Sequence, residues 1–179
     1  MRFIKLATAV FIASAFSTTP AQAQESATLK KIRETGTITL GHRESSIPFS
    51  YYDDKQQVIG YSHELMLKAV EGIKENLKLA KVDTKLMPVT SANRITLIQN
   101  GTIDIECGST TNNLERQKQV AFSTTIFVIG TRLMAKKTAG INDFADLAGK
   151  NVVTTAGTTS ERLLRKMNED NNMKMKIIS

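Results

Sequence analysis

The stretch Cys107-Gly108-Ser109-Thr110-Thr111-Asn112-Asn113-Leu114-Glu115-Arg116 decides the fold, because it places a polar loop and an arginine directly after an apolar run. That run, residues 103–107, is typical of a buried strand. The carbonyl groups of such a loop can accept hydrogen bonds from an ammonium group, and its hydroxyls and Arg116 can hold a carboxylate. An α-amino acid carries both groups. The alternative is an Asn-rich turn in which Arg116 caps its own helix.

Outward from this stretch, short apolar runs alternate with amphipathic segments, which predicts an α/β fold with helices packed on a sheet. Apolar residues from Leu65 to Leu77 recur at four-residue spacing and indicate one apolar helix face. We expect strands at residues 37–40, 84–87, 103–107, 151–155 and 175–178, a long β-rich passage at residues 120–135, and helices at residues 63–79, from a Ser91 cap to Asn100, 143–147 and 160–168.

The N-terminus has the pattern of a cleavable signal peptide. Arg2 and Lys5 precede an apolar run at residues 6–16, and Ala-Gln-Ala at residues 21–23 is a small-residue cleavage site. A membrane anchor would need about 20 apolar residues, more than this interrupted run offers. We therefore expect residues 1–23 to be removed and the exported chain to begin at Gln24.

Composition narrows the function classes. The formal net charge is +7 and the chain has no Trp. A basic balance is compatible with nucleic acid, a membrane surface or a small anion. Export and the lack of a basic run interleaved with aromatic residues argue against nucleic acid. Cys107 is the only cysteine, which excludes an intramolecular disulfide, and no metal-ligand spacing joins it to His42 or His63. We expect no metal, no cofactor and a buried structural role for Cys107.

Two further arginines are candidate anion contacts. Arg43 follows the strand at residues 37–40, where ligands collect in open α/β sheets, and its planar guanidinium can hold a carboxylate through two hydrogen bonds. The alternative is a surface arginine paired with Glu44. Arg94 lies in the first turn of the helix opened by Ser91, where it opposes the helix dipole unless an anion binds there. Tertiary packing would explain Arg94 equally well.

Thr158 and Thr159 place two hydroxyl groups at the start of the helix expected at residues 160–168, after the strand expected at residues 151–155. Thr158 and Glu161 have capping-box spacing, which is a structural explanation in itself. The same helix start can bind an anion with Thr159 as a donor. The segment lacks the spacing of a phosphate-binding loop, which argues against a nucleotide.

The chain is predicted to form two lobes joined near residues 130–132. A new βαβ unit begins near residue 150, and the sequence given stops before a sheet could cover it, so we expect a C-terminally truncated second lobe. Small ligands usually bind in the cleft between two such lobes.

These motifs together resemble the family 3 periplasmic amino-acid-binding proteins of ABC importers. Gly41-His42-Arg43-Glu44-Ser45-Ser46 and Glu106-Cys107-Gly108-Ser109-Thr110-Thr111-Asn112-Asn113 are similar to the glutamate/aspartate-binding branch. Asn100-Gly101-Thr102-Ile103-Asp104, Ala121-Phe122-Ser123 and Gly157-Thr158-Thr159 fit the same family. The resemblance runs from about Leu29 to Ser179.

The resemblance implies a type II periplasmic binding protein with two Rossmann-like lobes that close on the ligand. Residues 24–131 would form lobe 1, and residues 132–179 the first part of an incomplete lobe 2. The expected ligand is L-glutamate or L-aspartate, and the expected partners are the membrane subunits of an ABC permease. The exported protein is expected to be a periplasmic monomer and not an enzyme.

The resemblance also assigns roles to seven residues. Arg116, Thr111 and Thr159 match positions that hold the α-carboxylate, and Ser109 and Thr111 match positions that help to bind the ammonium. Arg43, Ser91 and Arg94 match positions that hold the side-chain carboxylate. The family's aspartate partner of the ammonium, and a histidine facing the ligand side chain, would lie beyond Ser179.

Other functions remain open because a fold does not fix a function. Dehydratases and sensor domains use related scaffolds, and a truncated remnant without function is a further alternative. A dehydratase would need a general acid or base in the cleft, and only Glu44 and Glu106 are candidates.

Overall fold

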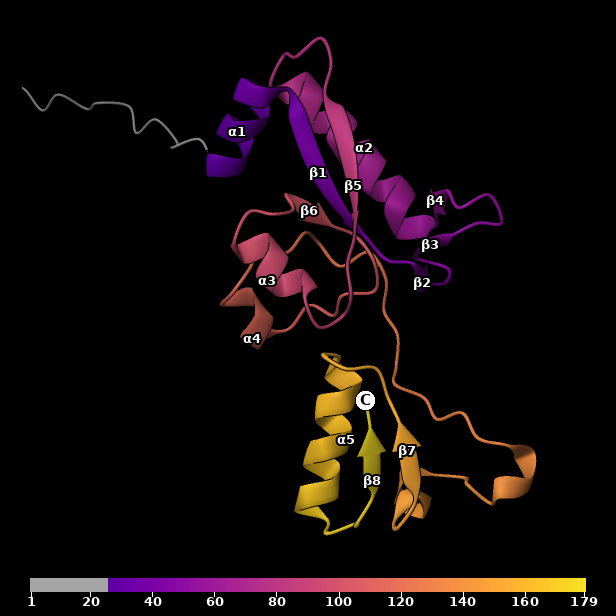
Figure 1. The fold of residues 1–179 in the computed structure, drawn as a ribbon. Helices are drawn as coiled ribbons and strands as arrows, with labels where there is room; N and C mark the ends of the chain where they lie inside the picture. The colour runs from indigo at the N-terminus through magenta and orange to yellow at the C-terminus, as the bar shows by residue number, and fades with distance from the viewer. Residues whose placement is uncertain (1–25) are drawn as a thin grey trace, which may run out of the picture.

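The structure is a computed structural model that describes residues 26–179. The expected signal peptide at residues 1–23 and the expected start at Gln24 lie outside these residues. Two lobes follow one another along the chain (Figure 1). We call residues 27–117 the N-terminal lobe and residues 144–178 the C-terminal lobe. Within residues 26–179, no helix is long and apolar enough to cross a membrane.

A three-stranded parallel sheet forms the centre of the N-terminal lobe. Strand β1 (Thr37–His42) lies between β5 (Asp83–Pro88) and β6 (Ile105–Glu106). The strands at residues 37–40 and 84–87 are confirmed, whereas β6 is shorter than the predicted strand at residues 103–107. Because all three strands run in the same direction, the loops that follow them meet at one edge of the sheet.

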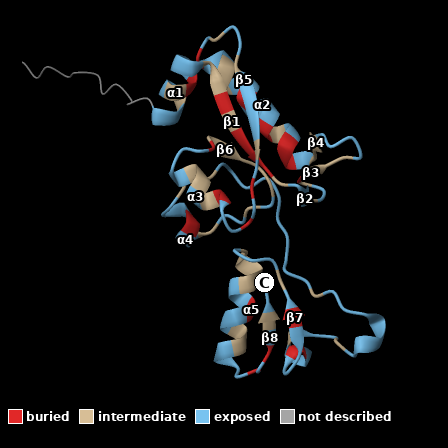
Figure 2. Cartoon of the chain, viewed as in Figure 1, coloured by how far each residue is buried: buried red, intermediate tan, exposed pale blue. Residues whose placement is uncertain are grey.

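Helices pack on this sheet because their apolar residues lie on one face. Helix α2 (Tyr61–Asn76) confirms the helix expected at residues 63–79, and α1 (Ala27–Thr35) is a helix that we did not predict. Ser26 caps the start of α1, and Gly36, in the left-handed conformation, ends it. The core consists of fully or almost fully buried apolar side chains, namely Ile32, Ile38, Leu40, Met66, Val70 and Leu77. Figure 2 shows this burial along β1 and α2.

A small antiparallel sheet holds the loop after β1. It consists of β2 (Ser45–Ser46), β3 (Ser50–Tyr52) and β4 (Val58–Ile59). Gly60 follows β4 with φ +121°, and a Cβ atom there would lie 2.6 Å from the carbonyl oxygen of Phe49. A glycine is therefore required where this sheet meets the start of α2.

Two short helices carry candidate site residues. Helix α3 (Arg94–Gln99) begins after an N-terminal cap at Asn93, so the prediction that Ser91 caps it is wrong. Ser91 lies in the preceding turn, because Asn93 Oδ1 accepts a hydrogen bond from the backbone N–H of Thr90 and closes that turn. Helix α4 (Leu114–Gln117) follows β6 and is capped by Asn113.

The β-rich passage expected at residues 120–135 forms no strand in the structure. Its apolar side chains are largely exposed: Phe127 by 56%, Val128 by 84% and Ile129 by 71%. A strand needs a partner for its backbone hydrogen bonds, and propensity alone cannot provide one. Phe127 instead packs edge-on against Phe49 and Tyr61. The 3₁₀ helix η1 (Lys137–Ala139) follows.

The C-terminal lobe is a single βαβ unit. It contains η2 (Phe144–Leu147), β7 (Asn151–Val153), α5 (Thr159–Asp170) and β8 (Lys176–Ile178), and β7 pairs with β8 in parallel. These elements confirm the strands and helices predicted after residue 140. The core of the unit is formed by Leu147, Val152, Leu164, Met173 and Met175. The lobe boundary near residues 130–132 stays a prediction.

Candidate functional site

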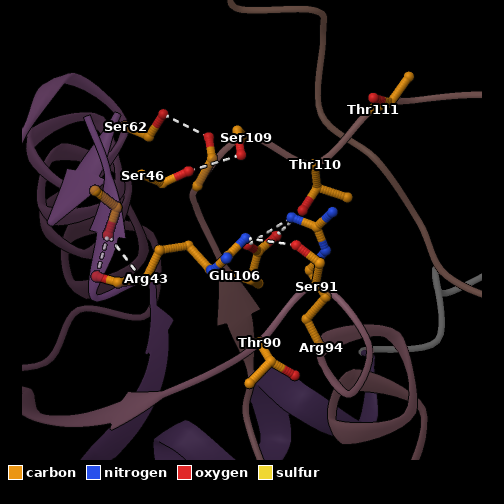
Figure 3. A network of polar contacts seen from close by, with 12 residues as sticks. Arg43, Ser46, Ser62, Thr90, Ser91, Arg94, Glu106, Ser109, Thr110 and Thr111 are labelled. Atoms are coloured by element: carbon orange, nitrogen blue, oxygen red, sulfur yellow. Dashed lines mark hydrogen bonds and ion pairs between the residues drawn. The ribbon is translucent and has the colours of Figure 1, made fainter. Parts of the chain in front are cut away.

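The predicted site residues of the N-terminal lobe gather at the carboxyl edge of its sheet. Arg43 follows β1, Ser91 follows β5, and the loop from Gly108 to Thr111 follows β6. Figure 3 shows Arg43, Ser91 and Thr110 close together, with Thr111 pointing away from them. The parallel strand order therefore brings together residues that lie far apart in the sequence.

Arg43 points into this cluster. Its Nη1 donates a hydrogen bond of 2.9 Å to Ser91 Oγ, and its backbone N–H donates one of 2.9 Å to Ser50 Oγ. Gly108 allows the loop after β6 to approach, because a Cβ atom there would lie only 2.7 Å from Cγ of Arg43. Among the described residues Arg43 forms no ion pair with Glu44, and its role as a ligand contact stays a prediction.

Arg94 is the most deeply buried arginine of the cluster, with a side chain that is 3% exposed. Its Nη1 lies 3.7 Å from Glu106 Oε1, and neither its Nε nor its Nη1 makes a hydrogen bond within the described residues. Burial lowers the pKa of Arg94 to about 10, against a raising effect from Glu106. At neutral pH Arg94 is therefore a cation with unused donors.

Glu106, which the sequence suggested only as a candidate general acid or base of an enzyme, is a buried carboxylate. Its side chain is 8% exposed, and its Oε2 accepts a hydrogen bond of 2.6 Å from Thr110 Oγ1. Its Oε1 has no hydrogen-bond partner among the described residues. Glu106 therefore joins Arg94 to the loop after β6.

Neighbouring hydroxyl groups fix that loop. Ser109 Oγ lies 2.8 Å from Ser46 Oγ, and Ser62 Oγ donates a hydrogen bond of 2.8 Å to the carbonyl oxygen of Gly108. Ser62 lies in the first turn of α2 and Ser46 in β2. The loop is thus held against β2 through the Ser109 hydroxyl and against α2 through the Gly108 carbonyl.

Arg116 connects the two lobes. Its Nη1 donates to the carbonyl oxygen of Thr111 at 3.0 Å, and its Nη2 donates to that of Gly157 in the C-terminal lobe at 3.2 Å. Burial lowers the pKa of Arg116, with a further lowering effect from Arg162. Asn113, rather than Arg116, caps α4. The alternative that Arg116 caps its own helix is therefore wrong.

Thr159 brings the start of α5 to the same place. Its Oγ1 lies 3.3 Å from Thr111 Oγ1. Thr158 caps α5 through a 3.1 Å hydrogen bond from the backbone N–H of Glu161, which confirms the structural role of that pair. An ion pair between Arg162 and Glu115 also joins the lobes. A cavity of about 330 Å³ lies beside these contacts and is lined by Arg116, Gly157, Thr158, Glu161, Arg162 and Arg165.

Two further titratable side chains lie beside the core of the N-terminal lobe: His42 is buried, whereas Cys107, expected to be buried, is only half-buried. His42 is 2% exposed and its Nδ1 lies 3.2 Å from the carbonyl oxygen of Arg43. Burial, followed by Glu106, raises the pKa of the Cys107 thiol to about 11, so the thiol stays protonated at neutral pH. Among residues 26–179, no group of three or more His, Cys, Asp or Glu side chains could hold a metal ion.

Several residues of this site were not predicted from the sequence. Glu106 and Thr110 lie inside the motif at residues 106–113 but were not assigned a ligand contact. Ser46 and Ser62 contact the loop after β6 from positions 63 and 46 residues earlier in the chain. Hydroxyl residues in the loop after β1 were a signal for Ser46. Nothing in the local sequence distinguishes Ser62 from an ordinary residue of a helix start.

Comparison with known proteins places this geometry in a family. The profile described as "Bacterial extracellular solute-binding proteins, family 3" matches residues 38–178, which include every candidate site residue. The chain belongs to this solute-binding family 3. The family resemblance expected from the motifs is thus confirmed.

Relatives within family 3 are similar over the whole chain. The L-glutamate/L-aspartate-binding protein of Pseudomonas aeruginosa is 62% identical over 94% of this chain and 56% of its own length. The glutamate/aspartate import solute-binding protein of Escherichia coli is 56% identical over 100% of this chain and 61% of its own length. The chain therefore spans about three fifths of the length of these relatives.

Solved structures support the fold. The ancestral amino acid-binding protein AncCDT-1, a precursor of cyclohexadienyl dehydratase, has a TM-score of 0.70 and 29% identity, over 84% of this chain and 63% of that one. The cysteine-binding protein of Campylobacter jejuni has a TM-score of 0.65 at 24% identity, over 84% of this chain and 58% of that one. The α/β fold class of type II periplasmic binding proteins is confirmed, and the relatives compared are binding proteins by name.

Proposed function

We propose that this chain is part of a solute-binding protein that binds L-glutamate or L-aspartate in the periplasm and delivers it to the membrane subunits of an ABC importer. One observation carries the proposal. Arg94 holds two buried donors that no described residue uses, close to Arg43 and Ser91 and at the same sheet edge as the hydroxyl loop. A ligand carboxylate would satisfy such donors, and an unsatisfied buried donor is costly.

The α-carboxylate belongs at the junction of the lobes. Arg116, Thr111 and Thr159 meet there, and Thr159 is the first residue of α5. An arginine and a helix start both favour a carboxylate over a neutral group. The cavity of about 330 Å³ beside Arg116 provides space on that side.

The ammonium and the ligand side chain extend from this point. Ser109 and Thr111 offer hydroxyl oxygens to the ammonium, as carbonyl oxygens of the same loop also can. Arg43, Ser91 and Arg94 then hold the side-chain carboxylate. Because every amino acid has the first two groups, discrimination between ligands rests on these last three residues.

The names of the relatives support the ligand and the transport context. Relatives that are 55–62% identical to the chain over the aligned residues are named for glutamate and aspartate. The signal-peptide pattern at residues 1–23 supports export, and a monomer would be sufficient because both lobes supply the site from one chain.

The direct test is thermal unfolding of the 179-residue chain with and without ligand. We expect glutamate or aspartate at about 10 mM to raise the unfolding midpoint more than glutamine does, because a ligand that binds only the folded state stabilises it. D-glutamate is the control for stereospecific binding. An unfolding midpoint that neither L-glutamate nor L-aspartate changes would contradict the proposal.

A substitution at Arg43 tests whether this residue contacts the side-chain carboxylate of the ligand. Arg43→Ala should weaken glutamate binding about 10- to 100-fold, because a charge-assisted hydrogen bond contributes about 1.5–3 kcal/mol, and should change glutamine binding much less. Competition titrations of both ligands against Arg43→Ala and the exposed control Lys55→Ala measure this. Equal weakening of both ligands by Arg43→Ala would show that Arg43 does not contact the side-chain carboxylate.

A further inference from the structure

A buried carboxylate lies inside the arginine cluster. Glu106 Oε1 is 3.7 Å from Arg94 Nη1, and both side chains are less than a tenth exposed. In Figure 3 the Glu106 carboxylate lies beside the guanidinium group of Arg94, and the Arg43 side chain reaches toward it from the other side. The charged side chains that face this place are Arg43, Arg94, Arg116 and Glu106.

Arg94 and Glu106 form an ion pair, but no hydrogen bond joins Arg94 Nη1 to Glu106 Oε1. Nη1 and Nε of Arg94 and Oε1 of Glu106 all lack a hydrogen-bond partner among the described residues. Glu106 therefore compensates the charge of Arg94 without occupying these donors. A buried arginine with no anion nearby would be costly in the ligand-free chain.

The same carboxylate opposes the ligand that we propose. A negative charge next to Arg94 reduces the positive potential at the place where the ligand's side-chain carboxylate would lie. Glutamine carries no charge there and is affected less. Glu106 thus stabilises the ligand-free chain but weakens the complex with an acidic amino acid.

We propose that Glu106 is a specificity-determining residue, a built-in counter-ion that stabilises the ligand-free arginine cluster and limits its preference for acidic over neutral amino acids. This inference rests on the proposed function, because it needs a ligand carboxylate near Arg94. It assigns to Glu106 a role in moderating affinity, so that the bound acidic ligand can be released.

Glu106→Gln isolates the charge. Glutamine is close in shape to glutamate, and its amide oxygen can still accept the hydrogen bond from Thr110. The burial of Arg94, 3% exposed, keeps that side chain in place by packing. We expect the ratio of glutamate affinity to glutamine affinity to rise about tenfold in this variant, because a nearby negative charge has been removed. We also expect the thermal midpoint of the ligand-free variant to fall.

Calorimetric or competition titration of the full chain with L-glutamate and L-glutamine measures the ratio. Glu75→Gln is the matched control, because it makes the same change of charge at an exposed position of α2 outside the site, and it should leave the ratio unchanged. If Glu106→Gln is too weakly folded for titration, its thermal unfolding is measured with each ligand instead. A variant that becomes folded in the presence of glutamate, but not in the presence of glutamine, would also support the inference.

Each other result decides against this role. A ratio that stays the same or falls, or a variant that is unfolded with and without glutamate, would show that Glu106 only supports the fold. Failure of the proposed function looks different, because the unsubstituted chain would then bind neither acidic amino acid.

Discussion

Arg116→Ala should weaken the binding of glutamate, aspartate and glutamine alike, by about 30-fold or more. Removing one partner of a buried, hydrogen-bonded charge pair costs about 2–5 kcal/mol, and the α-carboxylate is common to all three ligands. The variant also loses the link from Arg116 to the carbonyl oxygen of Gly157, so the lobes hold together less well. The ratio between ligands should stay almost constant.

Calorimetric titration of the three ligands tests this, with Lys118→Ala as the control. Lys118 is exposed and follows α4, the helix that carries Arg116, so its removal takes one positive charge from the same region without entering the site. A variant Arg116→Ala that lost glutamate binding but kept glutamine binding would show that Arg116 contacts the side chain of the ligand instead.

Gly157→Ala should weaken glutamate binding about fivefold or more by keeping the lobes apart, because overpacking costs about 1–3 kcal/mol. A Cβ atom at Gly157 would lie 2.6 Å from Cα of Ala92 and 2.9 Å from the carbonyl oxygen of Ser91. These are backbone atoms of the N-terminal lobe, so a rotamer change cannot relieve the clash. Gly157 also has φ +74°, which strains any other residue.

Gly149→Ala separates these two effects. Gly149 lies in the same lobe with φ +71°, but a Cβ atom there would meet nothing within 4 Å. Both variants should therefore lose similar stability from backbone strain, and only Gly157→Ala should lose affinity. Titration with glutamate after thermal unfolding of each variant is the measurement. Equal losses of affinity in the two variants would mean that the contact of Gly157 with Ala92 does not matter for binding.

Periodic apolar residues were sufficient to predict most elements of the fold. The helix expected at residues 63–79 and the strands expected at residues 37–40, 84–87 and 151–155 are present within a few residues of their predicted limits. In each case the signal is local, because burial of one face requires a repeat within the segment itself. Helix α1 was missed although Ser26 and Gly36 carry ordinary cap signals.

Predictions that depended on distant partners were less successful. The apolar residues at 120–135 have β propensity, but no strand of the described chain pairs with them. Ser91 has the chemistry of a helix cap, but α3 begins after Asn93, whose side chain makes no capping hydrogen bond, and Ser91 receives a hydrogen bond from Arg43, 48 residues earlier. Cap residues compete locally, and tertiary contacts decide which one is used.

By itself, the sequence determined the α/β class, the positions of the candidate ligand contacts and the family, because apolar periodicity and short motifs are properties of the chain. Only the tertiary structure placed Glu106 beside Arg94 and Gly157 against Ala92. The physical reason is that charge compensation and close backbone approach depend on distances between segments. Those distances are fixed by parallel strand pairing and by the contact between the lobes, which residue order alone does not express.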